Sequence, residues 1–322
     1  MSSFESLDSG SFSHGESHFA LNAWTRVWKG QRIWINIVLF LVTLLTTTAV
    51  GSRFQYNFDH NLPAFDLDRD IDSLIAWWHN PAVLWSGLPF SLTLLTILMA
   101  HEMGHYVACL FYGIDATLPY FLPGPSFTGT FGAFIRIRSP IWSRRQLFDI
   151  GIAGPLAGFV FLLPALGVGL AYSKVIPGIG AAGSMSFGTP LILWMLEHTI
   201  FPGVHAADLY LHPIARAAWV GVFATALNLL PIGQLDGGHI VYAIFGRRHR
   251  LITIAAIGLL IPIGWFFWRG WLLWAGVLFF LGRRHPSVYD GETIGRTRSK
   301  LALLGLIVFL LSFSLAPIVQ HW

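Results

Sequence analysis

The most regular feature of this chain is a series of long apolar blocks separated by shorter polar stretches. A transmembrane helix needs about 20 predominantly apolar residues, so blocks of this length favour membrane-spanning helices over core helices of a soluble domain. The segment 251–282 is long enough for two short spans with a tight turn between them. The pattern therefore predicts an all-α polytopic membrane protein with about seven transmembrane helices. The other expected spans cover about 33–51, 83–111, 149–171, 214–246 and 300–317.

The segments between these blocks are of a different character. Residues 113–140 are rich in Gly and Pro and cannot form one straight helix. The alternation through TFGAFIRI within them predicts a small β-hairpin or re-entrant loop. Residues 173–212 are mixed, with an amphipathic piece near 190–201. The polar start of the chain predicts a disordered cytoplasmic tail at 1–31, followed by a single transmembrane domain at 32–322.

Basic residues gather at alternate connections between the expected spans. Lys and Arg are enriched in the cytoplasmic loops of membrane proteins. Their distribution predicts a cytoplasmic N-terminus and an outside C-terminus, and it requires two spans rather than one within 251–282. The clusters comprise Arg26, Lys29 and Arg32, then Arg136, Arg138, Arg144 and Arg145, then Arg247, Arg248 and Arg250, and finally Arg283, Arg284, Arg296, Arg298 and Lys300.

Composition strengthens the membrane assignment and excludes other classes. Hydrophobic residues make up 54% of the chain and charged residues 11%, with a mean hydropathy of +0.61, whereas soluble domains carry about 25% charged residues. The single cysteine, Cys109, excludes an intramolecular disulfide and any multi-thiolate metal site. The formal net charge of +4 comes from clusters between the spans, so membrane orientation explains it better than nucleic-acid binding.

The candidate chemistry lies in the run HEMGH, inside the second expected span. His101 and His105 are four residues apart, so both rings project from one helix face and can reach one metal ion. Glu102 can then accept a proton from a water that zinc activates. A carboxylate near the bilayer centre costs about 2–3 kcal/mol and persists when it is paired or binds something. The alternatives are a trio of interhelical hydrogen-bonding residues and a haem-ligating pair, which would leave Glu102 without a role.

A catalytic zinc site needs a third protein ligand. Asp236 is the first candidate, because its flanking glycines permit a broken or closely approached helix around an expensive buried carboxylate. His101 and Asp236 each stand about ten residues from the cytoplasmic end of their spans, roughly 15 Å deep, so we expect them to meet. His205, His212 and His239 are the alternatives.

Two paired motifs resemble the site-2 protease family of intramembrane zinc metalloproteases. HEMGH at 101–105 and NLLPIGQLDGG at 228–238 match the family's HExxH and NxxPxxxLDG patterns. GTFGA at 129–133 and FDIGIAGPLAG at 148–158 are similar to segments of the same family. The stretch 212–240 resembles most closely the plant-plastid and bacterial, EGY-like branch, which lacks a PDZ domain.

The resemblance covers about 83–246, half of the chain, which we take as the catalytic core. It implies His101, His105 and Asp236 as zinc ligands and Glu102 as general base.

The resemblance also implies that Asn228 positions the substrate or stabilises a developing oxyanion, although such an Asn more often hydrogen-bonds between helices. The family's hairpin is thought to pair with an extended substrate, and 128–138 would supply that strand edge. An ordinary membrane-surface loop is the alternative for 128–138. Other branches insert a PDZ domain where this chain has only 173–212, so such substrate selection would need another protein.

These features predict an intramembrane zinc endopeptidase that cleaves transmembrane segments of other membrane proteins near the cytoplasmic side, in regulated intramembrane proteolysis. The expected partners are a transmembrane protein substrate and the lipid bilayer, with no nucleic acid. One alternative is a catalytically silent relative that only binds membrane proteins. Another is a metal or ion transporter, which predicts ionisable residues along a path that the other spans hardly offer. A bacterial inner membrane is the expected location, with a plastid membrane as the alternative, and the sequence leaves the substrate and the oligomeric state open.

Overall fold

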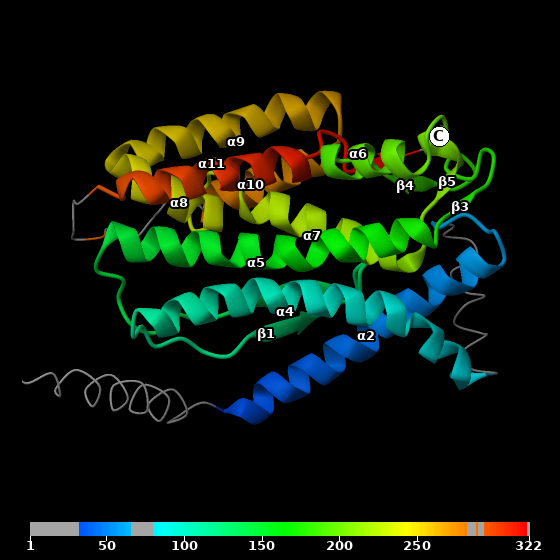
Figure 1. Cartoon of the computed structure of the whole chain (residues 1–322), viewed down its shortest axis with the longest axis horizontal. Coiled ribbons are helices and arrows are strands. Elements are labelled where there is room, and N and C mark those ends of the chain that lie inside the picture. The colour runs from blue at the N-terminus through cyan, green and yellow to red at the C-terminus, as the bar shows by residue number, and fades with distance from the viewer. Residues whose placement is uncertain (1–31, 66–79, 282–287, 289–292, 321–322) are drawn as a thin grey trace, which may run out of the picture.

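A computed structural model of the chain describes residues 32–65, 80–281, 288 and 293–320. This part is mostly helical, and its long helices run roughly along one direction (Figure 1). The predicted tail at 1–31 lies outside the described residues. The helices are α2 (Ile33–Asp59), α4 (Leu88–Phe111), α5 (Arg144–Ala171), α6 (Leu191–Ile200), α7 (Pro213–Asn228), α8 (Asp236–Phe245), α9 (His249–Phe266), α10 (Gly270–Leu281) and α11 (Gly295–Ser312), with short 3-10 turns η2 (Pro81–Gly87), η3 (Ala206–Asp208) and η4 (Gly246–Arg248).

Within the described residues, four helical stretches are long and apolar enough to cross a membrane, namely Ile33–Asp59, Pro81–Phe111, Arg144–Ala171 and Asp236–Phe266. The last of them is not one straight rod, because Gly246 adopts a φ of 56° between α8 and α9. The prediction of an integral membrane protein is therefore confirmed at the level of its helices. The count of seven spans stays a prediction, since α7 and α10 have 16 and 12 residues and a typical span has about 17–25.

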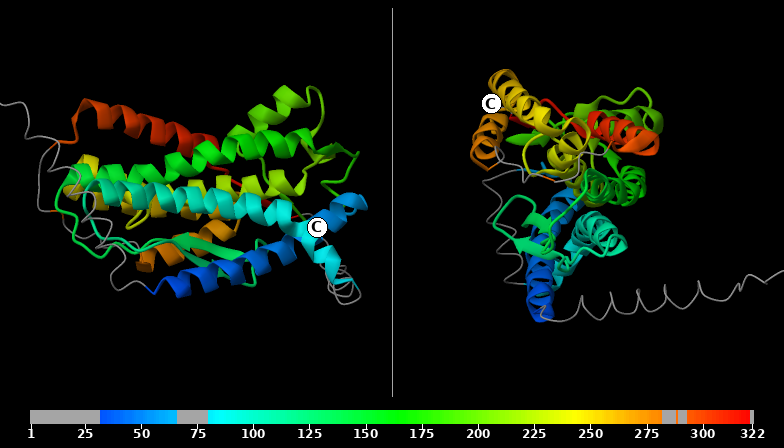
Figure 2. Two further views of the ribbon diagram at one scale, coloured as in Figure 1. Left: turned by 60° about the horizontal axis from the view of Figure 1, so that its bottom comes forward. Right: turned by 90° about the vertical axis from the view of Figure 1, so that its left-hand side faces the viewer.

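The centre of the bundle is the packing of α4, α5 and α7. Helices α4 and α5 lie side by side, and α7 packs against both (Figures 1 and 2). Leu162, Leu166, Trp219 and Val222 are completely or almost completely buried where α5 meets α7. Lipid tails are as apolar as these side chains, so close packing rather than transfer out of water holds such helices together.

The expected span at 214–246 is two helices rather than one. Helix α7 ends at Asn228, the chain turns irregularly through Leu229–Leu235, and α8 begins at Asp236. Pro231 has no backbone N–H to donate and its ring interferes with the preceding turn, so a helix cannot continue through it unbroken. The break places a loop and a helix N-terminus at the depth of the HEMGH run.

Three small antiparallel sheets in the described part of the chain make the all-α prediction too simple. Strands β1 (Tyr120–Pro123) and β2 (Thr130–Phe134) form the hairpin expected within 113–140, with an irregularity in register between Leu122 and Pro123. The other two sheets were not expected, because strands of two or three residues carry too little alternation to be recognised. They pair β3 (Lys174–Val175) with β5 (Leu209–Tyr210), and β4 (Met185–Phe187) with β6 (Ile318–Gln320).

The described basic residues of the predicted cytoplasmic side lie toward one end of the bundle. The start of α2, the start of α5, η4 and the start of α11 share this end, while α6 and the two smallest sheets occupy the other (Figure 1). Arg298 of α11 makes a two-pronged ion pair with Asp149 of α5, at 2.7 Å and 2.8 Å. Such an arrangement is what the predicted orientation requires, and the orientation itself stays a prediction.

Helix α6, at the opposite end, carries a buried carboxyl group. Glu197 is 8% exposed, and no described side chain makes an ion pair or hydrogen bond with its carboxyl group. Burial raises the pKa of Glu197 from an ordinary value of 4.5 to about 7. The neutral acid is therefore the form that the fold accommodates.

We predict that Glu197→Gln stabilises the protein at pH 8 but not at pH 5. Because the folded pKa lies above the unfolded one, stability contributed by the neutral acid is lost as the pH rises from 4.5 through about 7. The loss is on the order of 1–3 kcal/mol. Thermal unfolding of the detergent-solubilised protein measures it, and an equal effect of the substitution at both pH values would contradict this account.

Candidate metal centre

Helix α4 places three polar side chains in the interior of the bundle. His101, Glu102 and His105 are all buried, in a helix that is otherwise almost entirely apolar. At 3.6 residues per turn the two histidines lie one above the other, and Glu102 points about a quarter turn away from His101. The helix therefore presents two imidazoles together and a carboxylate beside them.

Asp236 of α8 meets the two histidines. His101 Nε2 lies 3.2 Å from Asp236 Oδ2, and His105 Nε2 lies 3.4 Å from Asp236 Oδ1. The two Nε2 atoms are 3.1 Å apart. The structure thus brings together two nitrogens and a carboxylate that are more than 130 residues apart in sequence (236 − 105 = 131).

These distances fit a tetrahedral zinc ion. Zinc bound at about 2.0–2.1 Å holds its ligand atoms roughly 3.3 Å from one another, the edge length of such a tetrahedron. His105 Nδ1 lies 2.7 Å from the Ile150 carbonyl oxygen, and a proton donated there leaves the Nε2 lone pair for a metal. Lone pairs and a carboxylate that converge in this way need a cation between them, and the nitrogen and oxygen set is one that zinc favours.

The break between α7 and α8 delivers Asp236 to this point. As the first residue of α8, Asp236 stands at a helix N-terminus, where the helix dipole favours a carboxylate. The returning loop passes very close, because a Cβ added at Gly237 would lie 2.1 Å from the Leu229 carbonyl oxygen. Only glycine fits there, so the LDGG sequence is explained by the tight approach of α8 to the end of α7.

Helix α5 closes over the histidines from the other side. It supplies the Ile150 carbonyl oxygen, and Gly154 faces the His105 ring so closely that a Cβ would lie 2.1 Å from His105 Nε2. Pro155 removes one backbone donor from this part of α5. The GIAGPLAG sequence therefore forms the surface of α5 against which the His105 imidazole packs.

Glu102 faces the hairpin rather than the donor atoms. The backbone N–H of Ile135, the residue after β2, is directed toward its carboxylate. His101, Glu102 and Asn228 share a cavity of about 200 Å³ with residues of β2 and α10, and the Asn228 amide nitrogen lies 3.2 Å from His101 Nε2. Trp274 of α10 borders the same cavity.

The alternative third ligands lie elsewhere. Within the described residues, the group of metal-binding side chains contains Asp236 and none of His205, His212 and His239. His212 instead caps α7, where its ring accepts a hydrogen bond from the Ile214 backbone N–H. The roles of Glu102 and of the donors stay predictions, whereas their meeting is a fact of the fold.

Sequence reasoning missed the groups that orient these side chains. The Ile150 carbonyl and the Ile135 N–H belong to the backbone and leave no signal in the identity of their residues. The bordering Trp274 was also missed, because an aromatic residue in an apolar span is unremarkable. The glycines of GIAGPLAG and LDGG were the available signals of close approach.

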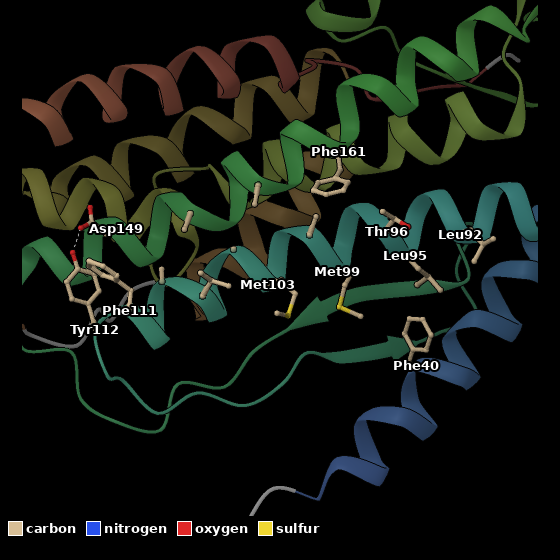
Figure 3. A pocket seen from close by; sticks show the side chains of 16 residues that line it. Phe40, Leu92, Leu95, Thr96, Met99, Met103, Phe111, Tyr112, Asp149 and Phe161 are labelled. Atoms are coloured by element: carbon tan, nitrogen blue, oxygen red, sulfur yellow. Dashed lines mark hydrogen bonds between the residues drawn. The ribbon is translucent and has the colours of Figure 1, made fainter. Parts of the chain in front are cut away.

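A larger cavity, of about 910 Å³, lies on the opposite side of α4 and has no part in this centre. Apolar side chains such as Phe40, Met99 and Phe161 line it (Figure 3). Its polar end is occupied by Tyr112 and Asp149, whose side chains are hydrogen-bonded. The two sides of α4 thus differ, one carrying the histidines and the other an apolar groove.

Long apolar helices that enclose two histidines and an aspartate, with a glutamate beside them, define an integral membrane protein with an HExxH-type metal centre. The chain belongs to peptidase family M50, the family of the site-2 proteases, whose sequence pattern matches residues 89–268. The predicted family is therefore confirmed.

Curated relatives agree with this assignment. "Probable zinc metalloprotease EGY1, chloroplastic" of Arabidopsis thaliana is 29% identical over 301 residues, 88% of this chain and 53% of that protein. "Probable zinc metalloprotease EGY2, chloroplastic" of the same plant is 30% identical over 258 residues, 79% of this chain and 45% of that protein. "Probable zinc metalloprotease EGY1, chloroplastic" of Oryza sativa subsp. japonica is 34% identical over 184 residues, which are 54% of this chain and 31% of that protein. The chain thus spans about half the length, or less, of these relatives.

Replacing Gly154 by alanine should displace His105 and weaken the metal centre. We expect zinc affinity to fall by about 10- to 100-fold, the usual result of disturbing the surroundings of a metal ligand. The matched control is Gly167→Ala on the same helix, where an added Cβ meets nothing within 4 Å. Zinc titration of the purified variants provides the measurement, and equal affinities would show that this surface of α5 does not position the ring.

The third ligand can be tested by a pair of substitutions on α8. Asp236→Ala should abolish tight zinc binding, because only two donors remain, whereas His239→Ala should retain it. Metal analysis after dialysis distinguishes the two variants. Zinc loss in His239→Ala with retention in Asp236→Ala would reverse the assignment.

Proposed function

We propose that this protein is an intramembrane zinc endopeptidase that cleaves transmembrane segments of other membrane proteins near the cytoplasmic side. The observation that carries the proposal is the convergence of His101, His105 and Asp236, with Glu102 beside them, within helices of transmembrane length. Membership of a peptidase family and the names of the relatives as zinc metalloproteases support zinc as the cofactor and hydrolysis as the reaction.

The depth of the centre supports cleavage inside the bilayer. His101 stands ten residues before the end of α4 at Phe111 (111 − 101 = 10), about 15 Å along the helix axis. Asp236 stands ten residues before Gly246, near the same basic end of the bundle (246 − 236 = 10). A scissile bond brought to this centre would therefore lie below the membrane surface on the predicted cytoplasmic side.

Each residue of the centre has a chemical task in this proposal. Zinc, when bound, supplies Lewis acidity to the hydrolysis of the peptide bond. Glu102 accepts a proton from the attacking water and returns it to the leaving amine. Asn228, whose amide nitrogen borders the donor group, donates a hydrogen bond to the oxygen of the scissile carbonyl as negative charge develops on it. The Ile150 carbonyl holds His105 in the tautomer that leaves Nε2 free.

The hairpin supplies the binding edge for the substrate. A peptide unwound in the membrane must find partners for its backbone N–H and C=O groups, and a strand edge offers them. Ile135 points its N–H toward Glu102, so Ala133, two residues earlier along the strand, points its N–H to the same side. Phe131, Gly132 and Ala133 line the cavity that also contains His101 and Glu102. An added substrate strand would thereby lie next to the catalytic groups.

The partner in this proposal is a membrane protein presented within the lipid bilayer. A bacterial inner membrane remains the predicted location. The relatives are named as chloroplastic proteins of plants and give it no support, so a plastid membrane is the location to compare with it.

The decisive variant is Glu102→Gln. It removes the proton acceptor without touching a zinc donor, so we expect cleavage to fall by at least about 100-fold while bound zinc is unchanged. Comparison of membrane proteomes from cells that carry the wild-type protein or the variant reveals substrates as proteins that stay intact only with the variant. Zinc analysis of both purified proteins accompanies it.

The matched control is Asp115→Asn, the same carboxylate-to-amide change at a half-exposed residue that forms an ion pair with Arg138 at 4.0 Å. It should cleave as the wild type does. Cleavage retained by Glu102→Gln would contradict the role of Glu102 as proton acceptor. Indistinguishable proteomes from wild type and variant, both loaded with zinc, would instead favour the catalytically silent alternative.

A further inference from the structure

A further cavity lies at the end of the bundle opposite to the basic clusters. This outer cavity has a volume of about 560 Å³ and is bounded by α6, α7, strands β4 and β5, and the segment that leads from α11 to β6. It shares no residue with the cavity around Glu102. It is therefore a site separate from that of the proposed peptidase chemistry.

Arg216 of α7 is the feature of the outer cavity that needs an explanation. Its side chain lines the cavity and is only 6% exposed, yet no described carboxylate lies within 4.0 Å of it. Its Nε donates a hydrogen bond to the Leu211 carbonyl oxygen at 3.0 Å. Among the described residues, no acceptor is hydrogen-bonded to its two terminal nitrogens. A buried cation without a counter-ion costs several kcal/mol, so such groups are normally paired.

Aromatic rings hold the guanidinium in place without neutralising it. Its central carbon lies 5.1 Å from the ring centre of Tyr210, 5.6 Å from that of Phe54 and 5.8 Å from that of Phe187. Stacking of this kind fixes the orientation of the planar fork while its terminal N–H groups remain free to donate. The fork is the geometry that recognises a carboxylate or a phosphate with two parallel hydrogen bonds.

Glu197 lines the same cavity but does not neutralise Arg216, since no oxygen of it lies within 4.0 Å of the guanidinium. The remaining lining is mostly apolar, and hydroxyl groups supply most of its other polar side chains. The apolar residues include Phe187, Leu193, Leu209, Leu211, Phe313 and Leu315. One cationic fork with an apolar chamber behind it fits a ligand that is itself part anionic and part apolar.

Helix α6 separates this chamber from the surroundings of the bundle. It spans only 10 residues, and Leu193 and Glu197 face inward while Leu191, Trp194 and Met195 are exposed on its outer side. A short helix with an exposed Trp and aliphatic side chains is suited to the interface of a bilayer, where amphiphiles are concentrated. The outer cavity is therefore one helix away from a source of lipid-like molecules.

We propose that the outer cavity binds an amphiphile with one anionic head group, a carboxylate or a phosphate, which Arg216 engages while the apolar chain fills the chamber. The head group supplies the counter-ion that Arg216 lacks. Fatty acids and phosphate-bearing lipids share this chemistry, and they differ in the shape and charge of the head.

The test uses the full chain purified in a neutral detergent and three probes of equal chain length: dodecanoate, dodecyl phosphate and dodecanol. Binding is followed by native mass spectrometry and by the shift in thermal unfolding. We expect at least one of the two anions to bind and dodecanol to bind at least about tenfold more weakly, because the alcohol cannot pair with the guanidinium. The stronger of the two anions identifies the head group. Equal binding of all three probes would overturn the proposal.

Variants assign the binding to the cavity. Arg216→Gln should lose at least about tenfold in affinity for the preferred anion, and Arg216→Lys should retain part of it. Unchanged zinc content shows that each variant is folded. If Arg216→Gln does not fold, Arg216→Lys alone provides the test. Glu197→Gln, which removes the other charge that can form in the cavity, should bind the anion at least as tightly as the wild type does. Anion binding that survives in both Arg216 variants without loss would place the site elsewhere.

Discussion

The structure depends on one requirement: charged and polar metal donors must be held in an apolar helical bundle without being left alone. Two imidazoles and the Asp236 carboxylate at this depth are each costly to bury alone, and a cation between them would offset that cost. His101, His105 and Asp236 satisfy that requirement to within the edge lengths of a zinc tetrahedron. The other features of the core follow from bringing these three side chains together.

Two backbone adaptations make this possible. One is the interruption between α7 and α8, which turns a continuous span into a loop and a helix start and so points a carboxylate inward. The other is the removal of side-chain volume where helices approach, as at Gly154 against His105 and at Gly237 against the end of α7. Both adaptations give up regular helix or side-chain volume so that the helices can approach closely. An interrupted helix is tolerated in a membrane only where neighbouring protein satisfies the hydrogen bonds of its backbone.

The sequence predicted the helices, the hairpin and the meeting of HEMGH with Asp236, because long apolar runs, alternation and paired motifs are strong local signals. It did not predict the division of the fourth span, since Pro231 and the glycines of LDGG permit a break without requiring one. It could not predict the sheets formed by β3 to β6, because pairing over two or three residues depends on tertiary contacts alone. Nor could it predict the contacts of Ile150 and Ile135, because a backbone carbonyl or N–H is present at almost every position.

The group of Ile135 that faces Glu102 is its main-chain N–H, and this has an evolutionary consequence. Apart from proline, any amino acid at that position keeps the same donor. Under the proposed function, the side chains of the hairpin can therefore diverge, and with them the preference for one substrate over another, while the surroundings of Glu102 are kept. In that proposal, substrate preference depends on the side chains of the hairpin and the surroundings of Glu102 depend on its main chain, so a change in one does not require a change in the other.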